Sequence, residues 1–340
     1  MKVLVTMKPG ALRDSFIDAD SRALLEANFD VTYNDLDHEF RDEELGDVIA
    51  RGFDIILTGW GTANLSAHAD KFSLLAHTGG SVGDLIDGGS FEKGLSVISA
   101  NKIYARSTAE GALSYILSAL HQVPSLTAKM RGRDFWKKDG EDETRGLCGK
   151  TVGIIGVGAV AKNLIDFLKP FNVKLKLYDD YRIDTDYLKM VGAEQATLDD
   201  VLSTSDVITV HAALTGKTYH MIGKRELSLI RDGALFVNTS RGAVIDESAL
   251  VDALAEGRFY AFLDVFEREP LDKDSPLRSL DNVFLTPHKA GPANDLYSYI
   301  GREIILDTIR FKNGEGLCYA VSREEAERMT RHNVKERVTG

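Results

Sequence analysis

The chain has 340 residues, of which 44% are apolar, and it carries a formal net charge of −11. This length predicts about two domains, and the negative charge argues against nucleic acid or an anionic membrane as the main partner. The two cysteines, Cys148 and Cys318, lie far apart without metal-type spacing, so we interpret them as reduced thiols. The N-terminal apolar run is too short for a signal peptide, and no stretch approaches a membrane span. We therefore expect a soluble, cytoplasmic protein.

The first hundred residues alternate short apolar runs with helical patterns. We expect strands at 3–6, 31–33, 54–58, 74–77 and 95–99, with helices between them such as 20–28 and 41–50. This alternation predicts a parallel α/β sheet. A glycine-rich stretch at 79–83 follows the fourth strand, at the end where ligands bind in open α/β sheets. A flexible turn would have the same composition.

An apolar helix is expected at 107–123, followed by a polar and charged stretch at 124–150. The polar stretch predicts a surface excursion. Within it, Trp136 could anchor the segment on the sheet or on a neighbouring subunit.

Residues 151–181 have the pattern of a dinucleotide-binding unit. An apolar strand runs into Gly156 and Gly158, a helical pattern follows to residue 168, and a second strand ends at Asp179. Gly156 allows the tight turn, Gly158 lets the backbone approach a pyrophosphate, and the small Ala161 lets the helix pack on the strand. The helix N-terminus favours the phosphates, and Asp179 lies where an acid receives the ribose hydroxyls. We therefore predict NAD rather than NADP as the cofactor, because the carboxylate would repel a 2′-phosphate.

Later strands are expected at 207–210, 234–238, 260–263 and 283–286. Thr197 and Asp246 are predicted helix N-caps. A long helix is expected at 294–311, and the charged tail from 323 is expected to be a solvated helix or a frayed end.

Three polar residues follow separate strands: Arg241, Asp264 and His288. The ends of parallel strands line one crevice, so these residues can converge. Arg241 has a planar fork suited to a carboxylate, although it could also be a surface residue. His288 is a natural acid/base near neutral pH, and Glu269 could orient it. Asp264 could orient a nicotinamide amide or cap a helix.

The chain resembles the D-isomer-specific 2-hydroxyacid dehydrogenase family, which includes phosphoglycerate dehydrogenases and glyoxylate/hydroxypyruvate reductases. The stretches that carry the resemblance are TVGIIGVGAVA, LYDDY, HAALTGKT, LFVNTSRGAVIDESALVDAL, FLDVFEREPL and DNVFLTPHKAG, from about 147 to 292. The first hundred residues match the family more loosely.

The resemblance implies two doubly wound parallel-sheet α/β domains. A Rossmann NAD-binding domain at 104–291 would be inserted into a flavodoxin-like substrate domain made of 1–103 and 292–340, and a homodimer is expected. The implied catalytic residues are Arg241, His288 as the acid/base and Glu269 as its partner. The implied site residues towards the cofactor are Gly156, Gly158, Ala159, Val160, Asp179, Thr239, Ser240 and Asp264. Gly80 and Ser81 would supply amides to the substrate carboxylate, together with Arg241.

The resemblance thus implies an NAD-dependent oxidoreductase that interconverts a D-2-hydroxy acid and its 2-oxo acid, with a small-molecule substrate and no nucleic-acid or membrane partner. The alternative is an NAD-sensing regulatory protein on the same fold, because related corepressors keep the same three residues. The chain departs from the family pattern at Ala159-Val160, at Gly80-Ser81, at Tyr104 and at Lys289. These departures concern the identity of the substrate.

Overall fold

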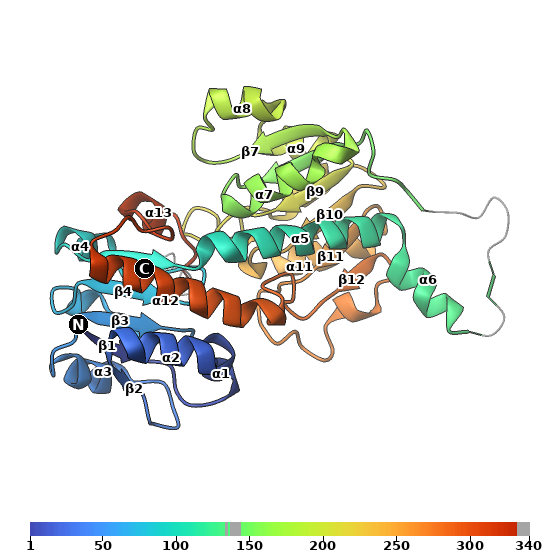
Figure 1. Ribbon diagram of the computed structural model, residues 1–340. Helices are drawn as coiled ribbons and strands as arrows, with labels where there is room; N and C mark the ends of the chain where they lie inside the picture. The colour runs from blue at the N-terminus through green and yellow to red at the C-terminus, as the bar shows by residue number, and fades with distance from the viewer. Residues whose placement is uncertain (133–134, 137–143, 332–340) are drawn as a thin grey trace. The chain divides into compact units, whose positions relative to one another are not determined.

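The computed structural model describes residues 1–132, 135–136 and 144–331. The chain divides into two compact units, Met1–Ala105 with Pro292–Gly340 and Arg106–Gly291 (Figure 1). Each unit is described by itself below.

The first unit is a parallel sheet with the strand order β2-β1-β3-β4-β5. Its strands are β1 Lys2–Val5, β2 Asp30–Tyr33, β3 Ile55–Thr58, β4 Leu74–His77 and β5 Ser96–Ser99. Its helices are α1 Ala11–Phe16, α2 Ala19–Asn28, α3 Asp42–Ile49, α4 Gly88–Glu92, α12 Tyr297–Asn313 and α13 Arg323–Glu327, with short 3-10 helices at Ser66–His68 and Asn294–Leu296. This strand order is the flavodoxin-like one, as predicted.

Alternate strand residues of this sheet face two different cores. Val3 and Val5 pack in a cluster with Ile300 of α12, whereas Leu4 packs in a second cluster with Leu45 of α3. The alternation follows from the period of two in a strand. The sheet is therefore covered on both faces, as a parallel sheet requires.

The second unit contains a seven-stranded parallel sheet with the order β12-β11-β10-β9-β6-β7-β8. Its strands are β6 Thr151–Ile155, β7 Lys174–Tyr178, β8 Ala193–Gln195, β9 Val207–Val210, β10 Leu235–Asn238, β11 Tyr260–Leu263 and β12 Val283–Leu285. Its helices are α5 Asn101–Leu120, which begins before the unit boundary, α6 Val123–Met130, α7 Ala159–Leu168, α8 Thr185–Val191, α9 Leu198–Thr204, α10 Lys224–Leu229 and α11 Glu247–Ala255, with 3-10 helices at Lys169–Phe171, Gly242–Val244 and Pro276–Ser279. The order reverses between β6 and β9, which defines the switch point of a Rossmann sheet. The predicted fold class is confirmed.

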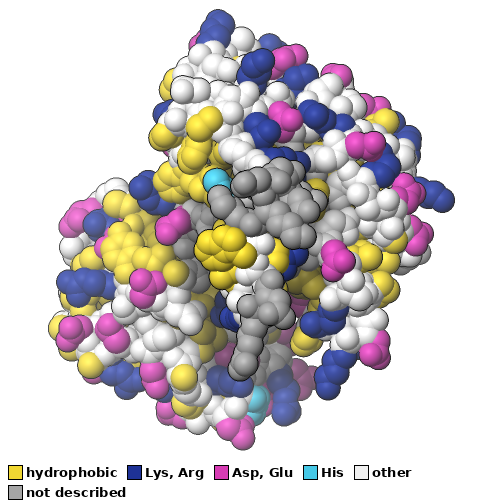
Figure 2. All heavy atoms as spheres, turned by 90° about the vertical axis from the view of Figure 1, so that its right-hand side faces the viewer, with side chains coloured by type: hydrophobic (Ala, Val, Ile, Leu, Met, Phe, Trp, Pro, Cys, Tyr) yellow, Lys and Arg dark blue, Asp and Glu magenta, His cyan; other side chains and the backbone are white. Residues whose placement is uncertain are grey.

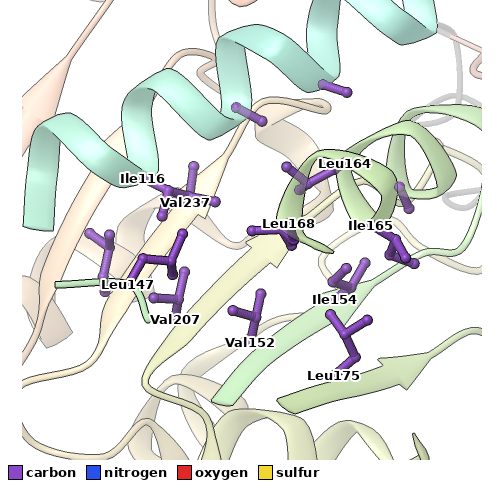
Figure 3. Close-up of a cluster of buried hydrophobic side chains, with 14 of the residues drawn as sticks. Ile116, Leu147, Val152, Ile154, Leu164, Ile165, Leu168, Leu175, Val207 and Val237 are labelled. Atoms are coloured by element: carbon purple, nitrogen blue, oxygen red, sulfur yellow. The ribbon is translucent and has the colours of Figure 1, made fainter. Parts of the chain in front are cut away.

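One face of this sheet is closed by α5 and α7. Ile116 of α5 and Leu164 of α7 lie over Val152, Ile154 and neighbouring strand residues, all of them buried (Figure 3). Ala161 is fully buried in the same cluster, so the small residue after the glycines lets α7 approach the sheet. This packing fixes the N-terminus of α7 at the end of β6.

The local predictions hold where short-range chemistry decides them. Thr197 accepts a hydrogen bond from the Asp200 amide at the start of α9, and Asp246 accepts one from the Ala249 amide at the start of α11. The strand β8 was not expected, and α5 begins at Asn101 rather than at residue 107. No helix within the described ranges combines the length and the apolar character needed to cross a membrane.

The tail forms a helix, α13, whose charged residues are exposed, as one of the two predicted alternatives had it, but its other face is not solvated. Ala326 in α13 is only 5% exposed and Thr330 only 8%. Ala326 packs in the apolar cluster that contains Leu4 and Leu45, with Met329 against it. Charged residues dominate the composition of the tail, so its sequence pattern did not indicate that Ala326 and Met329 pack against the core.

Candidate active site

The turn after β6 has the geometry that a dinucleotide requires. Gly156 has φ +90, and a Cβ there would lie 2.5 Å from the backbone nitrogen of Ala212, so no other residue fits without strain. Gly158 is the N-cap of α7, and a Cβ there would meet no protein atom within 4 Å. The protein itself therefore gives no steric reason for this glycine, whereas a closely approaching pyrophosphate does.

The first amides of α7 are open. In the part of the chain that the structure describes, the amides of Ala159 and Val160 donate no hydrogen bond, and no side chain caps the helix. A helix N-terminus of this kind attracts phosphate through its free N–H groups and its dipole. The turn therefore fits the NAD pyrophosphate.

Asp179 joins the end of β7 to the glycine turn. Its Oδ2 accepts a hydrogen bond of 2.7 Å from the Val157 amide, and its Oδ1 accepts one of 2.9 Å from the Tyr181 amide. Each carboxylate oxygen has a second lone pair. Asp179 therefore lies beside the turn and keeps acceptor capacity for ribose hydroxyls.

His288 and Glu269 form a hydrogen-bonded pair. His288 Nδ1 donates to Glu269 Oε2 over 2.7 Å, and Glu269 Oε1 accepts the Phe266 amide over 3.1 Å. Burial acts to raise the pKa of Glu269, but the bonds from His288 and Phe266 and the nearby charge of Arg241 outweigh it and hold the pKa below its usual range. The His288 side chain is 44% exposed, and no described residue bonds its Nε2. One ring nitrogen is thus fixed and the other is accessible.

Arg241 is held at the end of β10 by its neighbours in sequence. Its carbonyl accepts a hydrogen bond from Asn238 Nδ2, and its Nη1 donates to the Ser240 carbonyl. A Cβ on Gly242 would lie 1.9 Å from the Phe266 carbonyl carbon. The Arg241 segment therefore packs directly on the segment that carries Glu269, and one end of this unit brings together Arg241, Glu269 and His288.

Asp264 holds the segment that carries His288. The Asp264 side chain is fully buried. Its carboxylate accepts hydrogen bonds from Tyr115 Oη, Thr286 Oγ1 and the amides of Lys289 and Ala290. Its carbonyl accepts the His288 amide over 2.8 Å. His288 has φ 55, a left-handed conformation that is uncommon outside glycine, and these bonds keep it there.

Two contacts of this site were not anticipated from the sequence: Tyr115 donates to Asp264, and Glu247 Oε2 accepts the Glu267 amide two residues before Glu269. Burial raises the pKa of Tyr115 to about 12, so its hydroxyl stays a donor to Asp264. In the sequence, Tyr115 stands out only as a side chain with a polar hydroxyl within an apolar helix. Glu247 stands out only as a carboxylate directly after the N-cap Asp246.

Two other histidines are unsuited to proton transfer near neutral pH. His77 is buried and His211 is partly buried, and desolvation lowers the pKa of each to about 4. Both therefore remain neutral where His288 would work.

Gly80 and Ser81 lie in the first unit, in the loop that follows β4. The Gly80 carbonyl accepts a hydrogen bond from Ser99 Oγ, and Ser81 Oγ donates to the Thr330 carbonyl. No acceptor among the described residues takes the Gly80 or Ser81 amide. Tyr104 lies beside Gly80, with its ring 3.6 Å from a Cβ built there, and its hydroxyl is buried without a described partner. These open amides are suited to an anion.

The two remaining predicted contacts, Thr239 and Ser240, lie on the segment that follows β10 in the second unit. Thr239 is buried, and its hydroxyl has no hydrogen-bond partner among the described residues. Ser240 donates its amide and its hydroxyl to Asn238 Oδ1. Both residues follow β10 next to Arg241.

The fold and this arrangement define a dinucleotide-binding unit of the dehydrogenase type, and the second unit also carries the hydrogen-bonded pair His288 and Glu269. Residues 113–290 match the family model described as "D-isomer specific 2-hydroxyacid dehydrogenase, NAD binding domain". The chain belongs to the D-isomer specific 2-hydroxyacid dehydrogenase family. The predicted family and the predicted cofactor, NAD, are confirmed.

Similar proteins include a D-3-phosphoglycerate dehydrogenase of Methanocaldococcus jannaschii, 32% identical over 75% of this chain and 48% of the relative. A glyoxylate reductase of Korarchaeum cryptofilum is 34% identical over 66% of this chain and 68% of the relative. A crystal structure from Pyrococcus horikoshii OT3 is 26% identical, with a TM-score of 0.79 and 98% of each chain covered. The chain spans about half the length of the phosphoglycerate dehydrogenase relatives that it matches.

Proposed function

We propose that this protein is an NAD-dependent dehydrogenase that interconverts a D-2-hydroxy acid and its 2-oxo acid. The observation that carries the proposal is the 2.7 Å hydrogen bond between His288 and Glu269, with Arg241 beside them. When bound, NADH supplies the hydride that reduces C2 of the 2-oxo acid. The residues of the chain then have to bind the acid, handle the proton and exclude water.

His288 is the proposed acid/base. Its Nδ1–H is committed to Glu269, so its Nε2 is the nitrogen that protonates the developing alkoxide, or accepts that proton in the oxidation direction. Glu269 fixes the ring and stabilises the imidazolium when it forms, because its carboxylate stays ionised. Proton transfer by a positioned group of this kind contributes about 10²- to 10⁴-fold in rate.

Arg241 is the proposed substrate clamp. Its guanidinium has the planar donor fork that matches a carboxylate and an adjacent carbonyl oxygen. The same positive charge stabilises the alkoxide as it develops. Gly80 and Ser81 are proposed to bind the substrate carboxylate through their open backbone amides.

The assay that tests this proposal is NADH oxidation with a panel of 2-oxo acids: glyoxylate, hydroxypyruvate, pyruvate, phenylpyruvate and 3-phosphohydroxypyruvate. With an accepted acid, His288→Asn should lower kcat by about 10²- to 10⁴-fold while NADH still binds. His121→Asn is the matched control, since His121 is exposed in the same unit. Unchanged turnover in His288→Asn would refute the acid/base role. NADH binding without turnover of any acid would instead favour the NAD-sensing alternative.

We also propose that the protein forms a homodimer through α6. Val123, Leu126 and Met130 lie on one side of this helix and are 48%, 36% and 50% exposed, and the nearby Trp136 is 72% exposed. Figure 2 looks at the side of the chain where α6 lies in Figure 1, and apolar side chains are exposed on it. Aromatic residues and methionine are enriched at protein interfaces. We refer to these four residues as the α6 patch.

A reducing compartment such as the cytoplasm is proposed from the cysteines. Cys148 and Cys318 are both free and exposed, and exposed thiols persist where glutathione keeps them reduced. Titration with a thiol reagent on freshly isolated protein should therefore find both thiols reactive without prior reduction.

A further inference from the structure

We propose that residues 329–331 are a positioning element for the substrate loop, the segment 79–83 that follows β4. The inference rests on the proposed function, which assigns the Gly80 and Ser81 amides to the substrate carboxylate. Residues 329–331 contact no reacting group in this scheme. They act through the loop, by fixing the backbone that carries the two amides.

The contact is made by three consecutive loop residues. Ser81 Oγ donates to the Thr330 carbonyl over 2.9 Å and accepts the Gly83 amide over 3.3 Å. The Val82 amide donates to Met329 Sδ over 3.4 Å. The Ser81 hydroxyl therefore links the loop to the C-terminal segment and closes the loop on itself at the same time.

The packing leaves no room between the two segments. A Cβ on Gly83 would lie 2.5 Å from the Thr330 carbonyl oxygen and 3.2 Å from Arg331 Cγ. A backbone carbonyl cannot rotate away as a side chain can, so this position requires glycine as long as residue 330 stays in place. Val82 in the loop is fully buried, and Thr330 is 8% exposed. Residues 329–331 are thus packed directly against one side of the loop.

Residues 329–331 follow closely after α13, and this helix is itself held in place by several contacts. Ser322 caps the helix by accepting the Glu325 amide, and Glu325 reaches back to the Ser322 amide. Arg323 forms ion pairs with Glu92 of α4 and with Glu327. Ala326 is buried in the apolar cluster that contains Leu4 and Leu45. These contacts give residues 329–331 a fixed starting point, which a positioning element needs.

The proposal predicts an effect on the binding of the 2-oxo acid and none on the binding of NADH. The loop belongs to the first unit, and the turn that fits NAD belongs to the second. A change at the contact between loop and C-terminal segment should therefore raise the KM of the 2-oxo acid and leave the KM of NADH within about twofold.

Gly83→Ala and Gly88→Ala form a matched pair for the test. Each adds one methyl group, which in Gly83→Ala lies against residues 329–331 and in Gly88→Ala lies against side chains of α13. At Gly83 the new Cβ meets the Thr330 carbonyl, whereas at Gly88 it meets Glu327 Oε1 at 2.6 Å and Arg323 at 3.2 Å, the ends of two flexible and exposed side chains that can move while the backbone of α13 stays in place. Gly83→Ala should raise the KM of the 2-oxo acid by about tenfold or more, since displacement of a positioning group is costly, and Gly88→Ala by less than about twofold. Ser81→Ala keeps the amide but removes the link to Thr330, so it should raise the same KM and serves if Gly83→Ala fails to fold.

A second measurement separates this inference from the proposed function. Hydrogen exchange of the peptide covering residues 78–87 should be faster in Gly83→Ala and Ser81→Ala than in the wild type and Gly88→Ala. If the wild type turns over no 2-oxo acid, the proposed function fails, and exchange alone decides the positioning role. If the wild type is active but the two glycine variants have the same KM and the same exchange, the positioning element is refuted while the function stands.

Discussion

Glu247 Oε2 accepts a hydrogen bond from the backbone N–H of Glu267, with 2.7 Å between the two atoms. Glu267 lies two residues before Glu269, whose own Oε1 accepts the Phe266 amide. Two carboxylates therefore hold two consecutive amides of one segment. Because Glu247 is the first residue of α11, this helix fixes the segment that positions the partner of His288.

We expect Glu247→Ala to lower both stability and turnover. The Glu267 amide would lose its acceptor in a partly buried position, which costs about 1–3 kcal/mol, and Glu269 would be less well fixed. Urea unfolding and kcat measure the two effects. Glu256→Ala is the control at the other end of α11, where Glu256 makes an exposed ion pair with Arg258. Equal behaviour of the two variants would contradict a positioning role for Glu247.

Glu247→Gln tests the charge separately from the hydrogen bond. Burial raises the pKa of Glu247, with the charges of Glu267, Asp272 and Glu269 adding to the effect. Ionisation of this carboxylate therefore destabilises the folded state as the pH rises from the unfolded to the folded pKa. Glutamine keeps an acceptor oxygen without that charge, so the variant should be at least as stable as the wild type at pH 7. A clear loss of stability at pH 7 would argue against this account.

The Glu269 carboxylate should have the opposite effect to Glu247: its ionisation should stabilise the folded state, and this stabilisation should be lost in acid. Its pKa is held below the usual value of 4.5, so the folded state binds the proton more weakly than the unfolded state does. The stabilisation is fully present above the unfolded pKa and is lost as the pH falls through the folded pKa. The difference in unfolding free energy between the wild type and Glu269→Gln should therefore be constant above about pH 5.5 and shrink in acid. A difference that grew on acidification would contradict the lowered pKa.

Short-range chemistry explains what the sequence predicts well in this chain. The turn at Gly156 and Gly158, the N-cap Asp246 and the strand alternation all depend on residues a few positions apart, and the structure has them as expected. The β8 strand escaped prediction because it has only three residues, of which two are exposed.

Long-range contacts explain what the sequence does not predict. Tyr115 and Asp264 are 149 residues apart, and Ser81 and Thr330 are 249 apart. Nothing in the local pattern of either partner specifies the other, because the fold brings them together. Likewise, the sequence shows only that Asp264 is an acid after a strand. It does not indicate that the carboxylate accepts hydrogen bonds from four donors.

Asp264→Asn should be strongly destabilising. Asparagine would turn one acceptor oxygen into an NH₂ group facing donors such as the Lys289 and Ala290 amides, and an unsatisfied buried donor costs about 1–3 kcal/mol. Tyr115→Phe removes only one donor to the same carboxylate, so its cost should be about 1 kcal/mol. The melting temperatures of Asp264→Asn and Tyr115→Phe, measured by thermal unfolding, compare the two losses of stability. Equal losses would show that the carboxylate does not hold the His288 segment.

Asp179→Ala should weaken the preference for NADH over NADPH. In the proposed function this carboxylate would receive the ribose hydroxyls and repel a 2′-phosphate, so its loss should shift the ratio of the two dissociation constants by about tenfold or more towards NADPH. Fluorescence titration with each nucleotide measures the ratio. Asp180→Ala is the control, because Asp180 is the adjacent acid but bonds Tyr178 Oη rather than the glycine turn. An unchanged ratio in Asp179→Ala would remove the basis for predicting NAD from this residue.

The α6 patch makes the proposed dimer testable with a single charge. Val123, Leu126 and Met130 are spaced at i, i+3 and i+7, so they form one stripe along α6. A carboxylate in the middle of a buried apolar interface would be desolvated without a partner, which is costly. Leu126→Glu should therefore shift the protein from dimer to monomer in sedimentation velocity.

Met190→Glu is the matched control for that experiment. Met190 is an apolar residue of the same unit, 73% exposed on α8 and outside the α6 patch. It should leave the sedimentation coefficient unchanged, since an isolated exposed apolar side chain needs no partner. A Leu126→Glu protein that still sedimented as a dimer would place the interface elsewhere, and a monomeric wild type would refute the dimer itself.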